Sequence, residues 1–303
     1  MHDINRFKGI VMAFYAPFDE AGEVDCDGAL RQAEFYRSVG AKSLYLNGSS
    51  GEGFLLSLQE RKKLTEAVTK EFGSEMSIIV HVGAASTRDS VELARHAEQC
   101  GADALAAVPS VYYRLNDDSI EHHWNSIIDS TDLPFIIYNI PQLTGYDLTL
   151  RLLDKMVKNK KVVGVKNSSV NVGQIEQFKK AGGKDFIVFS GADDQYLAGR
   201  VMGAEAGIGG TYGMMPELFL RLEELIAGGD IGAAHELQSG INEIICEAVS
   251  FNNVYIVGKE ILRLRGVDIG SVRSPMLPIG KHEMPRIEAL HGKIKKLAGE
   301  VRR

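Results

Sequence analysis

Eight short runs of apolar and β-forming residues occur between residues 9 and 210, and amphipathic runs separate them. The runs begin about 20–35 residues apart, which is the spacing of strand–helix units. Since a helix pattern follows each run, the chain is predicted to form a closed parallel (β/α)8 TIM barrel. The alternative is an open doubly wound sheet, which usually has fewer strands and a glycine turn after the first. The predicted strands are residues 9–15, 43–48, 77–83, 103–109, 135–140, 162–167, 186–191 and 206–210.

The helix signals agree with this α/β architecture. Ser57 and Glu60 have the spacing of a capping box, and Gly73 stops the helix that they begin. After Tyr212 the strand signals cease. We therefore expect a (β/α)8 catalytic domain over residues 1–225 and a helical C-terminal extension packed on it over residues 226–303. The helices predicted after Tyr212 are residues 216–227, 231–250, 252–265 and 283–298, of which one completes the barrel.

The composition argues against several classes of protein. The net charge of −6 is spread without blocks, which disfavours a nucleic-acid surface. The three cysteines lie far apart and form no CxxC motif, as in a reducing cytoplasm. The first nine residues lack the apolar core of a signal peptide, and no run of about 18 apolar residues could span a membrane. We expect a cytoplasmic enzyme without nucleic-acid or membrane partners.

A lysine ends the sixth predicted strand, in the sequence VVGVKNSS. Strand alternation places Val162, Gly164 and Lys166 on one face, and reacting groups of such barrels lie at the carboxyl ends of strands. If Lys166 points inward, Gly164 leaves room beside it, and burial disfavours the charged amine, as a nucleophile requires. The alternative is a lysine that reaches solvent. Tyr138, near the end of the preceding strand, can meet Lys166 as a proton-transfer partner, although alone it would be a core residue.

Two loops at the same predicted rim carry polar groups. In NGSSGEGF, Ser49 and Ser50 offer hydroxyls and amide N–H groups that suit a carboxylate or phosphate, whereas Glu52 is expected to brace the loop. An ordinary turn is the alternative. In SGADD, Asp193 and Asp194 can accept hydrogen bonds from a polyol, or one of them can cap a helix. We predict no metal site, because no histidine or further acid is suitably spaced.

The motifs GSSGE, YNIP and GVK, in this order on the second, fifth and sixth strands, resemble those of the N-acetylneuraminate lyase and dihydrodipicolinate synthase superfamily. The similarity extends from about residue 8 to about residue 278. The resemblance implies a class I aldolase on a (β/α)8 barrel, usually a homotetramer, that needs neither a metal nor another cofactor.

The same resemblance implies roles for individual residues. Lys166 would form a Schiff base with a 2-keto acid, and Tyr138 would relay protons. Ser49 and Ser50 would hold the keto-acid carboxylate. Tyr112, in VPSVYY, matches the family tyrosine that reaches the active site of a neighbouring subunit.

Two positions favour the sialic acid lyase branch over the synthase branch, and two others differ from the lyase motifs. Leu143 stands where the synthase branch typically has arginine, and Asn167 stands where that branch favours glutamate. GADD and GIGGTYG resemble motifs of the lyase branch, but Asp194 replaces a glutamate and Gly210 replaces a serine. The substrate-binding residues that the resemblance implies beyond the serine loop are Ser168, Gly191, Asp193, Asp194 and Gly210.

The implied activity is reversible cleavage of N-acetylneuraminate, a sialic acid, to N-acetylmannosamine and pyruvate. Two alternatives stay open. One is another pyruvate-dependent aldolase of the superfamily, either 4-hydroxy-tetrahydrodipicolinate synthase or a 2-keto-3-deoxy sugar acid aldolase. The other is a non-catalytic protein that binds keto acids or sugars.

Overall fold

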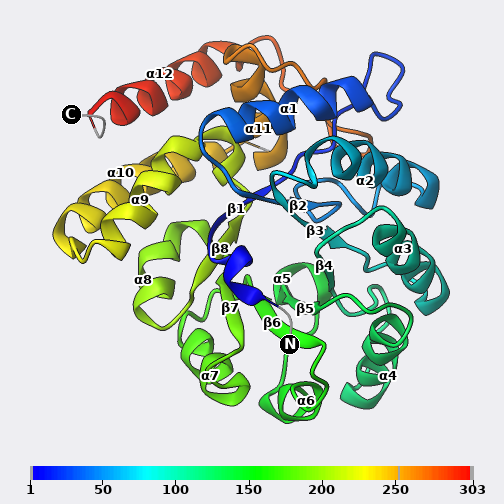
Figure 1. The fold of residues 1–303 in the computed structure, drawn as a ribbon. Helices are drawn as coiled ribbons and strands as arrows, with labels where there is room; N and C mark the ends of the chain where they lie inside the picture. The colour runs from blue at the N-terminus through cyan, green and yellow to red at the C-terminus, as the bar shows by residue number, and fades with distance from the viewer. Residues whose placement is uncertain (1–2, 252, 301–303) are drawn as a thin grey trace.

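The computed structural model describes residues 3–251 and 253–300. Eight parallel strands close into a barrel in chain order, and β8 pairs with β1 (Figure 1). Each strand lies within its predicted run, which confirms the (β/α)8 fold and excludes the open sheet. The strands are β1 (Gly9–Ala13), β2 (Ser43–Leu46), β3 (Ser77–His81), β4 (Ala104–Ala107), β5 (Phe135–Asn139), β6 (Val162–Asn167), β7 (Ile187–Ser190) and β8 (Ala206–Gly209).

The helices form a ring around the barrel (Figure 1). Helix α2 begins with the predicted capping box: Ser57 Oγ accepts from the Glu60 N–H at 3.3 Å, and the Glu60 carboxylate accepts from the Ser57 N–H at 2.7 Å. The helices up to β8 are α1 (Cys26–Ser38), α2 (Leu58–Phe72), α3 (Thr87–Gln99), α4 (Asp117–Ile128), α5 (Pro141–Thr144), α6 (Leu150–Met156), α7 (Gly173–Gly182) and α8 (Tyr196–Val201).

The segment after β8 is helical, as predicted. Helix α9 (Pro216–Ala227) packs against β1 and completes the ring. Helix α10 (Ile231–Val249) packs on α9, and α11 (Val254–Leu264) and α12 (Met284–Glu300) lie beside each other on the same side of the barrel (Figure 1). Residue 252, the start of one predicted helix, lies outside the described residues. The division into domains at residue 225 stays a prediction.

The barrel has an inner and an outer apolar layer, and β6 departs from strict alternation between them. Its pairing with β5 skips one residue, since Phe135 faces Val162 but Ile136 faces Gly164. Val163 consequently packs inside the barrel, and Val162 packs outside. The faces predicted for these two valines were therefore wrong, because a bulge reverses the alternation at the start of the strand.

The two adjacent histidines of α4 lie in different environments. His122 is exposed. His123 is instead buried, and one ring nitrogen lies 2.8 Å from Thr87 Oγ1. Burial lowers the pKa of His123 to about 4, so this side chain is neutral at pH 7.

Candidate active site

Lys166 lies at the carboxyl end of β6, directly beside Tyr138 in the ladder with β5. It is 5% exposed, and its Nζ stands 4.0 Å from the centre of the Tyr138 ring and 4.6 Å from that of Tyr45. The amine therefore faces aromatic rings at the barrel mouth, which is the end of the barrel where the carboxyl ends of the strands meet. The alternative of a lysine that reaches solvent does not hold.

The serine loop, residues 47–54, lies beside Lys166 and Tyr138. Ser49 Oγ is 3.4 Å from the Tyr138 hydroxyl, and Ser50 is buried. A side chain at Gly210, after β8, would begin 3.3 Å from Ser50 Oγ. Loops from distant parts of the sequence thus bring the two serines and Gly210 to the mouth occupied by Lys166.

The predicted pair of aspartates is split between two environments. Asp193 is half-buried, and its carboxylate accepts from both the amide and the hydroxyl of Thr211 at 2.6 Å. Burial raises the pKa of Asp193, although the Thr211 hydrogen bonds and the charge of Lys166 oppose that shift. Asp194 is exposed and lines a separate hollow of about 540 Å³ beside Gln238. Asp193 therefore belongs with the lysine, whereas no hydrogen bond among the described residues ties the Asp194 side chain to this group.

Ser168 and Gly191 contact each other at the ends of β6 and β7. A Cβ at Gly191 would lie 2.1 Å from Ser168 Oγ, so a larger residue would displace that hydroxyl. The Gly191 N–H donates to the Asn167 carbonyl at 2.8 Å, which fixes the two strand ends together. Both predicted residues therefore adjoin Lys166 along the chain or across the sheet.

Tyr112 does not join these buried side chains. It is 91% exposed and has a φ of +80°, an uncommon value for a tyrosine. Its ring packs edge-on against Tyr113 at 5.1 Å. Its reach into a neighbouring subunit stays a prediction.

Comparisons with known proteins identify the family of this chain. The model of the dihydrodipicolinate synthetase family matches residues 6–294. The chain belongs to this family. An N-acetylneuraminate lyase from Mediterraneibacter gnavus is 43% identical over an alignment that spans 94% of this chain and 91% of the lyase. A Salmonella agona N-acetylneuraminate lyase is 33% identical, with coverages of 93% and 95%. The wild-type sialic acid aldolase of Ruminococcus gnavus superposes with a TM-score of 0.96 and 41% identity, over 98% of this chain and 99% of that one.

This family member also has mouth residues that the sequence interpretation did not assign. Tyr45, on β2, packs edge-on against Tyr138 at 6.0 Å. Tyr255, on α11, lies 3.6 Å from where a Gly210 Cβ would stand. Burial raises the pKa of Tyr255, and the nearby carboxylate of Asp193 adds to this shift. Strand alternation could have indicated Tyr45. Nothing local indicates Tyr255, because α11 reaches the mouth only through tertiary packing.

His81 of β3 supports the mouth from within the barrel. Its Nδ1–H donates to the Asn47 carbonyl at 3.0 Å, and its Nε2 accepts from the Val108 N–H at 3.3 Å. Burial and the charge of Arg61 hold the pKa of His81 well below its usual range. A neutral imidazole with both nitrogens occupied joins the ends of β2, β3 and β4, and its ring packs edge-on against Tyr138 at 5.8 Å.

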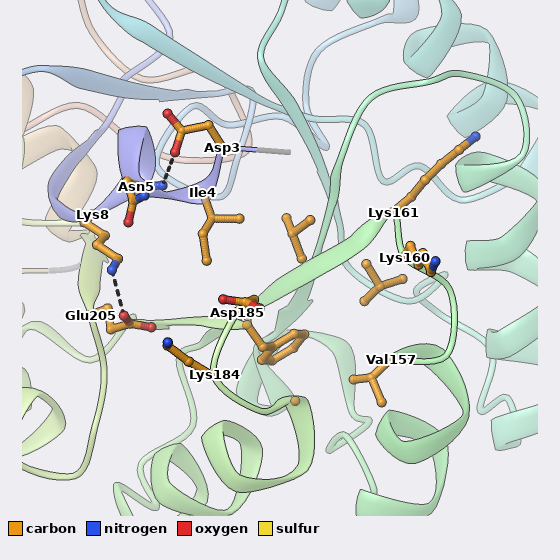
Figure 2. Close-up of a pocket in the computed structure, with 14 residues that line it drawn as sticks. Asp3, Ile4, Asn5, Lys8, Val157, Lys160, Lys161, Lys184, Asp185 and Glu205 are labelled. Atoms are coloured by element: carbon orange, nitrogen blue, oxygen red, sulfur yellow. Dashed lines mark hydrogen bonds and ion pairs between the residues drawn. The ribbon is translucent and has the colours of Figure 1, made fainter. Parts of the chain in front are cut away.

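A cavity of about 810 Å³ lies at the other end of the barrel (Figure 2). It adjoins the amino ends of β6 and β8, and its charges include both signs, as in the Lys8–Glu205 pair at 3.0 Å. That end of a (β/α)8 barrel serves stability rather than catalysis. The chemistry-bearing residues gather instead at the carboxyl ends of the strands.

Over residues 3–251 and 253–300, no cluster of three or more histidine, cysteine or acidic side chains could hold a metal ion. Over the same ranges, every helix is too short or too polar to cross a membrane.

Proposed function

We propose that this chain is a class I aldolase that cleaves N-acetylneuraminate reversibly to N-acetylmannosamine and pyruvate. The observation that carries the proposal is the buried amine of Lys166 at the barrel mouth, 4.0 Å from the Tyr138 ring centre. The relatives named N-acetylneuraminate lyase support the choice of substrate. A catalytic lysine mutant of the same Ruminococcus gnavus sialic acid aldolase superposes with a TM-score of 0.97, and the existence of a catalytic lysine in that protein supports a reacting lysine here.

The covalent steps begin at Lys166. Its neutral amine attacks C2 of the open-chain sugar acid, and loss of water leaves a protonated imine that can accept an electron pair. The Tyr138 hydroxyl gives its proton to the departing water, and the resulting phenolate takes the proton of the C4 hydroxyl as the C3–C4 bond breaks. The bonding pair moves toward the imine nitrogen. N-acetylmannosamine leaves, and the remaining enamine receives a proton at C3. Hydrolysis of the imine then releases pyruvate and restores the amine.

The surrounding polar groups bind and orient the substrate. Ser49 and Ser50 hold the keto-acid carboxylate, which fixes C2 for attack by the amine. Ser49 also lies 3.4 Å from the Tyr138 hydroxyl and so links carboxylate binding to the proton relay. The residues that face the remainder of the sugar acid are Ser168, Gly191, Asp193 and Gly210. Asp194, which is exposed beside Asp193, contacts only the outer end of the sugar tail.

The assembly and the compartment are part of the proposal. A homotetramer would cover the exposed ring of Tyr112 and let it reach a second active site. The three cysteines, Cys26, Cys100 and Cys246, are free, which fits the cytoplasm.

Borohydride reduction in the presence of pyruvate tests the chemistry. The wild-type chain should gain a permanent adduct on Lys166, and Lys166→Ala should lose both the adduct and cleavage. Lys161→Ala is the matched control, because that lysine precedes the same strand at its amino end and should keep both. Native-rate cleavage by Lys166→Ala would contradict the mechanism.

A panel of 2-keto sugar acids tests the substrate. Asp194 and Gly210 differ from the residues typical of the sialic acid branch, so the panel should include acids without the N-acetyl group. N-acetylneuraminate should have the highest kcat/KM. Negligible turnover of it beside rapid turnover of another acid would replace the substrate but keep the aldolase.

A further inference from the structure

One ion pair in the described part of the chain is fully enclosed. Lys259 Nζ, on α11, lies 2.6 Å from Glu52 Oε1, and both side chains have 0% exposure. Lysine and glutamate are almost never fully buried unless paired, because both lose their hydration. A buried ion pair contributes little net stability, since replacing it with apolar residues of the same volume is often neutral or stabilising. Its position therefore calls for another explanation.

Both partners are held by further contacts with the C-terminal segment. Lys259 donates to the Ser271 carbonyl at 2.7 Å and lies 4.5 Å from the centre of the Phe18 ring. Glu52 accepts from the Arg273 N–H at 2.8 Å with its second oxygen. The Glu52 carboxylate is thus tied at one oxygen to α11 and at the other to the chain that follows this helix.

Glu52 belongs to the turn that carries the two serines. Its N–H donates to the Ser49 carbonyl at 3.1 Å, and its φ of +50° is a conformation that residues other than glycine rarely adopt. Such a backbone persists only when its surroundings hold it. At the other end of the turn, the Asn47 carbonyl is held by His81. Ser49 and Ser50 therefore lie between two buried anchors.

We propose that Lys259 is a positioning residue: through Glu52 it holds the Ser49 and Ser50 hydroxyls where a keto-acid carboxylate binds. The inference rests on the proposed function, because it assigns that loop the carboxylate. It differs from a purely structural role in one measurable respect. A positioning pair affects the binding of the keto acid, whereas a structural pair affects the folded fraction and leaves the affinity of the folded enzyme unchanged.

The test is the double variant Glu52→Gln/Lys259→Met. Removing both charges avoids an unpaired buried charge, so the barrel should fold. The matched control is Glu260→Gln/Arg263→Met, which removes a partly exposed pair from the same helix. For each protein, the half-saturating pyruvate concentration is measured by borohydride trapping, and the KM values for pyruvate and N-acetylmannosamine are measured in the condensation direction.

For the double variant we expect the pyruvate values to rise about tenfold or more, since a misplacement of about 1 Å can cost up to ~100-fold. The KM for N-acetylmannosamine and all values of the control should stay near wild type. Unchanged pyruvate values in a folded double variant would overturn the inference, and so would an equal rise for both substrates. Glu52→Asp, which keeps both charges of the buried pair but shortens the acid by one CH2 group, should give a smaller rise in the same direction and decides the matter if the double variant does not fold. If wild type itself forms no pyruvate adduct, the proposed function fails instead.

Discussion

Removing the Tyr138 hydroxyl tests whether this residue is a catalytic phenol or an aromatic residue of the core. Tyr138→Phe keeps the ring, which packs edge-on against Tyr45 and His81. The hydroxyl contacts Ser49 Oγ at 3.4 Å, which is long for an O–H···O bond, so its loss should change the free energy of unfolding by less than about 1 kcal/mol. A positioned proton relay contributes roughly 10²–10⁴ in rate, or about 3–5 kcal/mol of barrier. The rate effect should therefore far exceed the stability effect.

Three measurements on Tyr138→Phe separate the two roles. Steady-state cleavage of N-acetylneuraminate should fall by that factor, borohydride trapping of pyruvate should still label Lys166, and urea denaturation should give a nearly native midpoint. Tyr36→Phe is the control, because it deletes an equally buried hydroxyl, bonded to Gln32 at 3.3 Å, outside the mouth. A native cleavage rate in Tyr138→Phe would refute the relay. A large loss of stability with a proportional loss of activity would make Tyr138 a core residue.

Three further changes test other parts of the structure. Gly164→Ala would place Cβ 2.5 Å from both Cγ2 and the carbonyl oxygen of Ile187, so urea denaturation should show a loss of about 1–3 kcal/mol; no loss would mean that the bulge yields. The pKa of about 4 for His123 lies below its value in the unfolded chain, so the unfolded chain binds the proton first as the pH falls. Between pH 6.5 and 4 this difference should remove up to about 3 kcal/mol from the free energy of unfolding. His123→Gln should lose less stability over this range, and an equal loss in wild type and variant would contradict the prediction. Gly210→Ser, beside Ser50, should alter the kcat/KM ratio among keto sugar acids while pyruvate trapping stays constant; a change in pyruvate alone would place Gly210 at the carboxylate.

Much of the fold follows from local sequence. Strand periodicity and helix ends depend on near neighbours, so the eight strands and the capping box at Ser57 were predictable. The meeting of Lys166 with Tyr138 was predictable as well, because consecutive strands of a barrel are neighbours and both residues end their strands. The bulge at Val162 was not, since two valines in succession fit either face of a strand and only pairing with β5 decides between them.

The contacts that hold the residues at the barrel mouth in place were harder to predict from the sequence. Glu52 could be given a bracing role from its place in the glycine-rich loop, but its partner could not be named. Lys259 lies 207 residues later (259 − 52) on a helix whose packing on the barrel has no local signature. Tyr255 reaches the mouth from the same helix for the same reason. Contacts of this kind depend on the closed fold as a whole.

These observations divide the proposed work of the site between two parts of the chain. The reacting pair, Lys166 and Tyr138, stands on adjacent strands of a closed sheet, where backbone hydrogen bonds on both sides fix each side chain. The serine loop has no such ladder and depends on His81 at one end and on Lys259, through Glu52, at the other. Changes in α11 should consequently weaken the hold on the keto acid while the amine stays in place. A variant of α11 that moved Lys166 itself, seen as a loss of the adduct at saturating pyruvate, would show that the two parts are not independent.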